Sequence, residues 1–330
     1  MEVLVTGATG FVGARLVEEL LNRGCGVRVL TRKPIEQYQN IAWSKKVASI
    51  QGDLKKDRDS IKKAVQEVDV VVHLAAQLGS WRTKQEDYID VNYNGTKLLV
   101  EASRAAGVQH FLYISTAGVF GTLKKIPADE THPCSPRYPY EKTKYQAEQY
   151  ISEKIKEGFP ATIIRPSHIY GPGDLNTVPL LKILQNIHLF PLIGGGTSFF
   201  QPLYIEDLIQ GIILVINNRN TVCGQLYVLS GEDITTFKKY IQINSKLMGA
   251  RVLTPAFPYA FARFTAISNE ALAKLLNIEP VLTRFRVDFL GGHQCYNIQR
   301  SKHDFGFNPA VGLEQGVEKA INWYRERKLI

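Results

Sequence analysis

In the first half of the chain, short and almost continuous apolar runs alternate with amphipathic segments. The apolar runs have the length of strands and occupy residues 1–6, 27–30, 47–51, 68–74, 111–115 and 161–165. Apolar residues recur at helical spacing over residues 11–22, 59–67, 88–106 and 140–157. Strands that are buried on both faces and alternate with helices form parallel sheets with helices on each side. The pattern therefore predicts an α/β fold built on a doubly wound parallel sheet.

This alternation weakens from residue 171 onward, where prolines and aromatic residues become frequent. Helical spacing remains over residues 178–186, 207–216, 236–248 and 313–327. We expect residues 1–170 to form the sheet domain, with a segment near 202–230 returning to it, and residues 171–330 to form mainly a smaller mixed α/β substrate lobe. In doubly wound folds, ligands bind outside the carboxyl ends of the strands. Substrate is therefore expected in the cleft between the two lobes.

Composition and apolar run length indicate a globular protein rather than a membrane protein. The chain of 330 residues is 45% hydrophobic, which suffices for the packed cores of about two domains. The N-terminus reads as a strand rather than as a leader, and the longest clean apolar run, residues 212–216, is far shorter than the ~20 residues of a membrane span. We expect a soluble, cytoplasmic protein with no integral membrane segment.

Charge and cysteine content argue against two further classes of function. Lys and Arg exceed Asp and Glu by 9, but they are spread over short clusters such as Lys45-Lys46, with no basic stripe interleaved with aromatic residues. This favours attraction of anionic cofactors or metabolites over nucleic-acid binding. The four cysteines, at positions 25, 134, 223 and 295, lack metal-ligand spacing, so we expect neither a metal site nor disulfides.

A glycine pattern follows the first strand and opens the first helix. It reads Thr6-Gly7-Ala8-Thr9-Gly10-Phe11-Val12-Gly13. Gly7 permits the tight turn, Gly10 lets the backbone approach a pyrophosphate, and Gly13 lets the helix pack closely. The free N–H groups and positive dipole end of the helix attract phosphate. The pattern predicts a dinucleotide held by Gly7, Thr9, Gly10, Phe11, Val12 and Gly13.

A candidate acid–base pair lies near the start of a later predicted helix. Tyr140 and Lys144 stand four residues apart, so both side chains lie on one helix face. An ammonium group stabilises a neighbouring phenolate, so Lys144 is expected to lower the pKa of Tyr140 from about 10 toward a range useful for proton transfer. A hydroxyl also follows the fifth strand, with Thr116 as the first choice and Ser115 as the reserve. The candidate catalytic residues are Thr116, Tyr140 and Lys144.

The glycine loop, the hydroxyl and the Tyr–Lys pair together resemble the extended branch of the short-chain dehydrogenase/reductases, the NAD-dependent epimerase/dehydratase superfamily. The resemblance covers essentially the full chain and implies a Rossmann sheet with a nicotinamide cofactor. Five further fragments resemble motifs of that branch: Asp53-Leu54, His73-Leu74-Ala75-Ala76, Val91-Asn92-Tyr93-Asn94-Gly95-Thr96, Arg165-Pro166-Ser167-His168-Ile169-Tyr170-Gly171-Pro172-Gly173 and Tyr204-Ile205-Glu206-Asp207-Leu208.

The resemblance also implies roles for single residues. Tyr140 protonates a substrate carbonyl oxygen as the nicotinamide delivers hydride, Thr116 holds that oxygen, and Lys144 binds the nicotinamide ribose. The reverse direction oxidises an alcohol. His73 reads as a core or supporting histidine, and homodimers through helices 88–106 and 140–157 are usual in similar proteins. Implied cofactor contacts beyond the glycine loop come from Asp53, Leu54, Leu74, Ala75, Ala76, Asn92, Tyr140, Lys144, Pro166 and His168.

The end of the second strand distinguishes between the two nicotinamide dinucleotides. Members that prefer NAD carry an acidic residue there, which binds the ribose 2′-hydroxyl. This chain has Thr31, followed by Arg32 and Lys33, a pair suited to a 2′-phosphate. NADP(H) is therefore favoured over NAD(H), and a preference for NADPH points toward reduction.

Two departures from the nucleotide-sugar enzymes of the superfamily bear on the substrate. His168 replaces an Asn, and Phe200 stands where an Arg is expected near the diphosphate. Aromatic residues are frequent in the second half and suit either an apolar ligand or the core of the lobe. The predicted substrate contacts are Thr116, His168, Phe199 and Phe200.

The C-terminal part resembles the 3β-hydroxysteroid dehydrogenase-like and dihydroflavonol reductase-like group, through Glu279-Pro280-Val281-Leu282-Thr283, Tyr296-Asn297 and Phe305-Gly306-Phe307-Asn308-Pro309. This implies a ketone or secondary alcohol on an apolar substrate such as a steroid, terpenoid, flavonoid or β-keto lipid. Two alternatives stay open. One is a nucleotide-sugar epimerase or ketoreductase with the same Tyr–Lys chemistry. The other is a non-catalytic NADP-binding sensor or assembly subunit, against which the intact Tyr140 and Lys144 argue.

Overall fold

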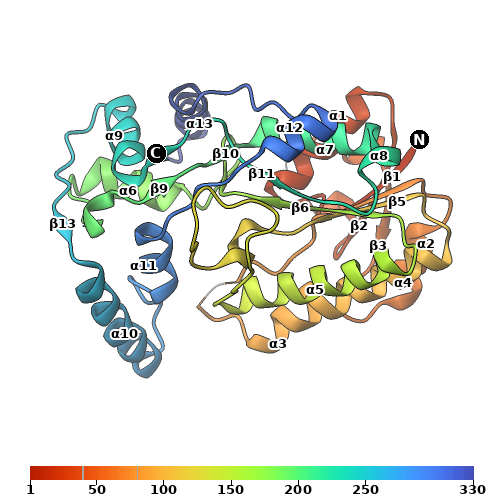
Figure 1. Ribbon diagram of the computed structural model, residues 1–330, viewed down its shortest axis with the longest axis horizontal. Coiled ribbons are helices and arrows are strands. Elements are labelled where there is room, and N and C mark those ends of the chain that lie inside the picture. The colour runs from red at the N-terminus through yellow and green to blue at the C-terminus, as the bar shows by residue number, and fades with distance from the viewer. Residues whose placement is uncertain (39–40, 80) are drawn as a thin grey trace.

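A seven-stranded parallel sheet forms the middle layer of the protein in the computed structural model, which describes residues 1–38, 41–79 and 81–330 (Figure 1). Its strands run in the order β11-β6-β5-β4-β1-β2-β3. They are β1 (Glu2–Thr6), β2 (Gly26–Thr31), β3 (Ala48–Gln51), β4 (Val70–His73), β5 (His110–Ile114), β6 (Ala161–Pro166) and β11 (Leu226–Leu229). The direction of growth reverses between β1 and β4, where doubly wound folds open a crevice at the carboxyl ends of the strands. The predicted fold class is confirmed.

Helices cover both faces of the sheet because successive strand residues point to opposite sides. In β1, Val3 and Val5 pack in one hydrophobic cluster and Leu4 packs in another. Figure 1 shows the two helical layers above and below the sheet. The upper layer contains α1 (Phe11–Asn22), α7 (Ile205–Asn217), α8 (Arg219–Val222) and α12 (Gln299–Phe305), and the lower layer contains α2 (Arg58–Val65), α3 (Gln85–Tyr88), α4 (Thr96–Ala105) and α5 (Pro139–Lys156).

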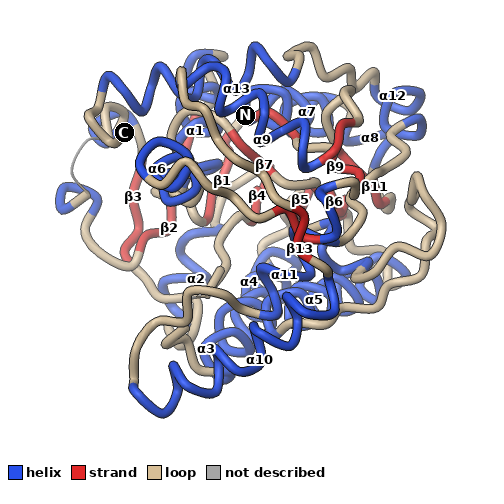
Figure 2. The backbone as a smooth tube through the Cα atoms, turned by 90° about the vertical axis from the view of Figure 1, so that its left-hand side faces the viewer, coloured by secondary structure: helices blue, strands red, loops and turns tan. Residues whose placement is uncertain are grey.

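The remaining elements form a second lobe at the carboxyl edge of the sheet (Figures 1 and 2). Its helices are α6 (Val178–Asn186), α9 (Phe237–Met248), α10 (Tyr259–Leu276), α11 (Arg284–Gly291) and α13 (Leu313–Glu326). Its strands pair as β10 (Leu203–Tyr204) with β7 (Ile169–Tyr170), β12 (Thr235–Thr236) with β9 (Phe199–Phe200), and β13 (Ala256–Phe257) with β8 (Leu192–Ile193). The segment expected to return to the sheet supplies β11, which pairs with β6. A domain boundary at residue 170 stays a prediction.

The helix predicted over residues 88–106 is present, but its first part is not α-helical. After α3, the chain passes through a π-helical segment, Ile89–Gly95, before α4 begins. Within this wider turn the Asn92 side chain binds the backbone of Gln77. The Gln77 N–H donates to Asn92 Oδ1 at 2.7 Å. Asn92 Nδ2 donates to Gln77 O at 3.2 Å and to Thr143 Oγ1 at 3.1 Å. These contacts depend on tertiary structure, so helical periodicity does not reveal the π turn.

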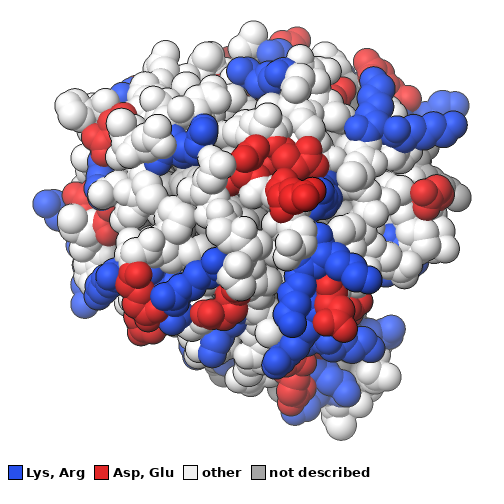
Figure 3. All heavy atoms as spheres, turned by 90° about the vertical axis from the view of Figure 1, so that its right-hand side faces the viewer, with Lys and Arg blue, Asp and Glu red and all other residues white. Residues whose placement is uncertain are grey.

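Charged side chains of both signs are interspersed on the face drawn in Figure 3. Clusters of Lys and Arg there lie next to Asp and Glu rather than forming one continuous basic area. Within the described part of the chain, no helix has both the length and the apolar character needed to cross a membrane.

Candidate active site

The glycine turn after β1 packs closely against the end of β4. Gly7 has a φ of +73°, which glycine adopts without strain, and a Cβ on it would lie 2.7 Å from the backbone nitrogen of Ala75. A Cβ on Gly13 would lie 2.1 Å from the carbonyl oxygen of Gly7. A Cβ on Gly10 would meet the same oxygen at 3.3 Å, which is a much milder contact. Gly7 and Gly13 are therefore required by the protein's own packing.

Helix α1 begins directly at this turn with Gly10 as its N-cap. Within the described residues its first turn has neither a side-chain cap nor an acidic side chain. The first N–H groups of a helix have no partner inside the helix and carry its positive dipole end. This arrangement fits the pyrophosphate of a dinucleotide, which the turn residues Gly7, Thr9, Gly10, Phe11, Val12 and Gly13 would hold.

The ends of β1 and β4 are joined by a buried histidine. His73 Nδ1 lies 2.6 Å from Thr6 Oγ1, and His73 Nε2 lies 2.8 Å from Thr96 Oγ1. Burial lowers the pKa of His73 to about 3, so the imidazole is neutral. The Ala75 nitrogen donates to Thr6 Oγ1 at 3.3 Å. These contacts hold the segment after β4, which includes Leu74, Ala75 and Ala76, beside the glycine turn.

Three charged residues lie just after the carboxyl ends of β2 and β3. Arg32 and Lys33 are exposed directly after β2, whereas Thr31 is buried and donates to the Lys33 carbonyl at 2.8 Å. Asp53 follows β3, and the adjacent Leu54 is buried in the core. The strands are paired, so these segments lie at one edge of the sheet. Exposed cationic side chains are thus available where an adenosine ribose would sit in this fold.

Lys144 is buried one helical turn after Tyr140 on α5. Its Nζ donates to the Ile114 carbonyl at 2.6 Å and lies 4.1 Å from the centre of the Tyr113 ring. Burial lowers the pKa of Lys144 to about 7, although Glu148 acts in the opposite direction. Burial, and to a smaller extent Glu141, raises the pKa of Tyr140 to about 12. The lowered phenol pKa that we expected from Lys144 is therefore contradicted, because burial raises the pKa of Tyr140 and the Lys144 ammonium is bound to the Ile114 carbonyl.

The structure distinguishes between the two hydroxyls after β5. Thr116 lines a cavity between the sheet and the second lobe, and its Oγ1 accepts a hydrogen bond from Gly118 N at 3.1 Å. Ser115 is buried and donates to Glu148 Oε2 at 2.9 Å. Glu148 is also paired with the buried Arg165. Ser115 therefore belongs to a buried polar network, and Thr116 is the hydroxyl that faces the cavity.

A cavity of about 520 Å³ lies between the sheet and the second lobe. The carboxyl edge of the sheet and α5 contribute Thr116, Tyr140, Pro166 and His168 to its wall. The segments between β5 and α5 add Leu123, Arg137 and Tyr138. The opposite side carries the aromatic residues Tyr259, Phe285, Phe289 and Tyr296, together with Asp288, His293 and Gln294. The candidate acid and the candidate hydroxyl thus share one cavity with a largely apolar wall.

Comparison with known proteins identifies the family. Residues 3–230 match the NAD dependent epimerase/dehydratase family. The chain belongs to this family. Members of the family use a nicotinamide dinucleotide, for which the glycine turn and the ends of β2, β3 and β4 form a fitting site. The resemblance inferred from the sequence is confirmed.

Two relatives align over nearly the whole chain. The 3-beta-hydroxysteroid dehydrogenase of Mycolicibacterium neoaurum is 30% identical, and the alignment covers 98% of this chain and 91% of the relative. The 2-alkyl-3-oxoalkanoate reductase of Stenotrophomonas maltophilia is 29% identical, with coverage of 97% and 98%. The solved UDP-glucuronic acid 4-epimerase of Bacillus cereus superposes with a TM-score of 0.79 over 99% of both chains at 23% identity, which shows a shared fold.

Two of the four predicted substrate contacts, Phe199 and Phe200, are not among the described residues that line the cavity. Phe200 is only 2% exposed and packs in the core against Tyr240, with ring centres 5.1 Å apart. Phe199 is partly exposed beside His293. Phe200 packs behind the cavity wall, against His168 and Phe289, and Phe199 lies at the surface, so the structure does not support direct substrate contacts by these two residues. His168 does line the cavity, beside Phe289, and burial lowers the pKa of His168 although Asp174 acts in the opposite direction.

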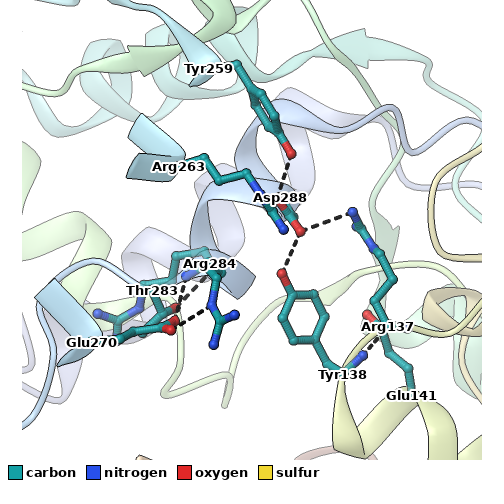
Figure 4. A network of polar contacts seen from close by, with 10 residues as sticks. Arg137, Tyr138, Glu141, Tyr259, Arg263, Glu270, Thr283, Arg284 and Asp288 are labelled. Carbon is teal, nitrogen blue, oxygen red and sulfur yellow. Dashed lines mark hydrogen bonds and ion pairs between the residues drawn. The ribbon is translucent and has the colours of Figure 1, made fainter. Parts of the chain in front are cut away.

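An unpredicted polar network forms part of the same wall. The Asp288 side chain on α11 is 1% exposed and accepts hydrogen bonds from Tyr138 at 2.5 Å, from Tyr259 at 2.7 Å and from Arg263 (Figure 4). Arg137 Nη1 lies 3.0 Å from its carboxylate. The five residues come from α10, α11 and the segment before α5, up to 151 positions apart in sequence. The sequence offers little to predict this network. Arg137 and Tyr138 directly precede Pro139, where α5 begins, but this position does not indicate that they bind Asp288.

Proposed function

We propose that the protein is an NADP(H)-dependent oxidoreductase that reduces a ketone, or oxidises a secondary alcohol, on a largely apolar substrate. The candidate substrates are steroids, terpenoids, flavonoids and β-keto lipids. The observation that carries the proposal is the shared cavity, in which Thr116 and Tyr140 meet the apolar side chains of Leu123, Phe285 and Phe289. A cavity of about 520 Å³ has the size of a typical small-molecule site.

The protein's residues would act as acid, hydrogen-bond donor and anchor. A bound NADPH supplies the hydride. Tyr140, whose raised pKa keeps the phenol protonated at neutral pH, donates its proton to the substrate oxygen. Thr116 donates a hydrogen bond to the same oxygen. Lys144 would bind the nicotinamide ribose, and its lowered pKa allows it to exchange protons near neutral pH.

The preference for NADP(H) rests on the two cations after β2. Arg32 and Lys33 are exposed at the edge of the adenosine site, and Thr31 stands where an acidic residue would bind the 2′-hydroxyl of NAD. A guanidinium group binds phosphate with two parallel hydrogen bonds. NADPH is therefore the proposed reductant.

The substrate class is also supported by the relatives, whose names specify a hydroxysteroid and an alkyl-oxoalkanoate. A nucleotide sugar would need cations for its diphosphate. Arg137, in the cavity wall, already shares the Asp288 carboxylate with Arg263. This pairing favours the apolar substrate over the nucleotide-sugar alternative.

The first test is loss of NADPH absorbance with a panel of 3-ketosteroids, β-keto acids, flavonoid ketones and nucleotide 4-keto sugars. We expect turnover of an apolar ketone, and Tyr140→Phe should lower it by roughly 10²–10⁴-fold because the proton donor is lost. NADPH binding should be retained. Tyr150→Phe is the control, since this phenol lies on the same helix and binds Glu101 instead of facing the cavity.

Three results would contradict the proposal. Undiminished turnover by Tyr140→Phe would exclude the phenol as the acid. Turnover confined to nucleotide sugars would favour the epimerase or ketoreductase alternative. Tight NADPH binding without turnover of any substrate in the panel would favour the sensor or assembly subunit.

A further inference from the structure

Helix α10 presents large apolar side chains to solvent. Phe261, Phe264, Leu272 and Leu275 are 58%, 66%, 52% and 80% exposed. Relative to Phe261, the other three follow at spacings of 3, 11 and 14 residues, which at about 3.6 residues per turn brings all four to one face of the helix. The exposed apolar residues therefore form a stripe along α10 rather than a scatter of single positions.

The opposite side of α10 is built from small residues. Ala262, Ala266 and Ala273 are the buried positions of this helix. Two of them, Ala262 and Ala266, pack with Ile193 and Val287 in a small hydrophobic cluster. A surface helix of a globular protein ordinarily buries its large apolar residues and exposes polar ones. In α10 the large residues point outward, so the stripe is not explained by the fold's own core.

The stripe continues into the connection to α11 and into the start of α11. Ile278, Val281 and Phe285 are 52%, 81% and 47% exposed. We call the whole surface the α10 face, made of Phe261, Phe264, Leu272, Leu275, Leu276, Ile278, Val281 and Phe285. Figure 1 shows α10 projecting at one corner of the molecule, away from the sheet, and Figure 2 shows it at the lower edge. Continuous exposed apolar surfaces of this kind mark interaction sites.

The α10 face has a basic border. Residues 251–290 contain five Lys or Arg residues against three Asp or Glu residues. One of the three acids, Asp288, is buried in the network, which leaves Glu270 and Glu279 as the exposed or half-buried acids. Lys274, Arg284 and Arg286 are exposed. Arg284 is paired with Glu270 and Arg286 with Glu279, so these five side chains carry a net charge of +1. The border of the stripe is therefore weakly positive, and Lys274 is the cation available to an anionic surface.

The α10 face also adjoins the cavity. Tyr259 and Phe285 line the cavity, and both are also exposed, by 39% and 47%. The rim of the cavity thus lies at the N-terminal end of α10 and at the start of α11. A surface that covers the stripe would reach the opening through which an apolar substrate enters.

We infer that the α10 face docks on the surface of a lipid bilayer that contains anionic lipids. Helix α10 lies in the plane of the interface, with its four large apolar side chains among the acyl chains and the basic residues at the headgroups. The rim residues Tyr259 and Phe285 then face the bilayer, from which an apolar ketone passes into the cavity. This last step depends on the proposed function, whereas the docking itself does not.

A second copy of the chain fits the same face less well. It would cover the rim at Tyr259 and Phe285 and close the cavity to a substrate. A symmetric contact would also bring the basic borders of two copies together. A bilayer satisfies the apolar stripe, the basic border and the open rim at the same time.

The test is sedimentation of the full-length protein with vesicles of phosphatidylcholine alone or of phosphatidylcholine and phosphatidylserine in equal amounts, without substrate. We expect binding to the mixed vesicles that weakens as salt is raised. Phe264→Ser/Leu275→Ser should lower the partition coefficient by roughly tenfold or more, because two large apolar side chains are lost from the interface. Ile234→Ser/Leu175→Ser is the matched control, since both residues are exposed, by 52% and 61%, on other segments.

Light scattering and thermal unfolding complete the test. The variants should keep the unfolding midpoint and NADPH affinity of the wild type, because the changed side chains are exposed. Wild-type protein that stays in the supernatant with both vesicle types would overturn the inference, as would equal loss of binding by the control. A dimer that the α10 variant dissociates, without vesicle binding, would assign the face to a second copy. Vesicle binding is measured without turnover, so its failure is separate from failure of the proposed reaction.

Discussion

Burial raises the pKa of Tyr140 to about 12 and lowers the pKa of Lys144 to about 7. The phenol consequently keeps its proton at neutral pH, and the ammonium of Lys144 is held by the Ile114 carbonyl and the Tyr113 ring rather than by the phenol. A protonated phenol in the cavity wall suits a general acid, which is the role that ketone reduction requires. At the scale of the residue, the surroundings of the two side chains determine the protonation state of each one.

The cations after β2 lead to a prediction about cofactor choice. Arg32→Ala/Lys33→Ala should raise the dissociation constant for NADPH by about tenfold to a hundredfold and leave that for NADH nearly unchanged, because hydrogen bonds to charged groups are worth about 1.5–3 kcal/mol. Fluorescence titration of both cofactors measures this. Lys238→Ala/Lys239→Ala, on α9 in the second lobe, is the control for the loss of two exposed positive charges. If the variant bound NADPH and NADH more weakly by the same factor, these two residues would not bind a 2′-phosphate.

At the scale of the element, the glycines of the β1–α1 turn separate into two kinds. A Cβ on Gly13 would overlap the Gly7 carbonyl at 2.1 Å, whereas a Cβ on Gly10 would meet it at 3.3 Å. We expect Gly13→Ala to destabilise the protein by roughly 1–3 kcal/mol, because α1 must move away from the turn. Gly10→Ala should leave the unfolding midpoint nearly unchanged and weaken NADPH binding by roughly tenfold, because the pyrophosphate approaches this backbone.

Chemical denaturation and cofactor titration of the two glycine variants provide the measurement, and each variant serves as the other's control. If Gly10→Ala bound NADPH as tightly as the wild type, the turn would not contact the pyrophosphate. If Gly13→Ala were as stable as the wild type, the close approach of α1 to Gly7 would not matter for packing.

At the scale of the whole molecule, Asp288 connects the second lobe to the segment that precedes α5, the helix that carries Tyr140 and Lys144. Burial alone would raise the pKa of the Asp288 carboxyl, but hydrogen bonds from Tyr138, Tyr259 and Arg263, together with Arg137, lower it below its usual value. The folded state therefore stabilises the carboxylate. Four partners from two segments converge on the Asp288 carboxylate, so its loss would loosen the wall that faces Tyr140.

We predict that Asp288→Asn lowers the free energy of unfolding by roughly 1–3 kcal/mol at neutral pH, because the arginines and phenols lose a charged acceptor. A group whose folded pKa is depressed contributes its stability above the unfolded pKa and loses it as pH falls through the folded pKa. The difference between wild type and variant should thus be full at pH 7 and shrink below about pH 4. Urea unfolding at several pH values measures it, with exposed Asp59→Asn as the control. A difference independent of pH would contradict the role of the carboxylate.

The sequence by itself determined the features that follow from short-range spacing. Apolar runs located six of the seven strands of the sheet, and helical periodicity located α1, α5 and α13. Contiguous motifs indicated the glycine turn, Thr116 and the pair of Tyr140 and Lys144. Only the tertiary structure decided the burial of Phe200 in the core, the π turn around Asn92, the outward stripe of α10 and the network around Asp288. These depend on contacts between residues far apart in the chain, and such contacts are set by packing rather than by local periodicity.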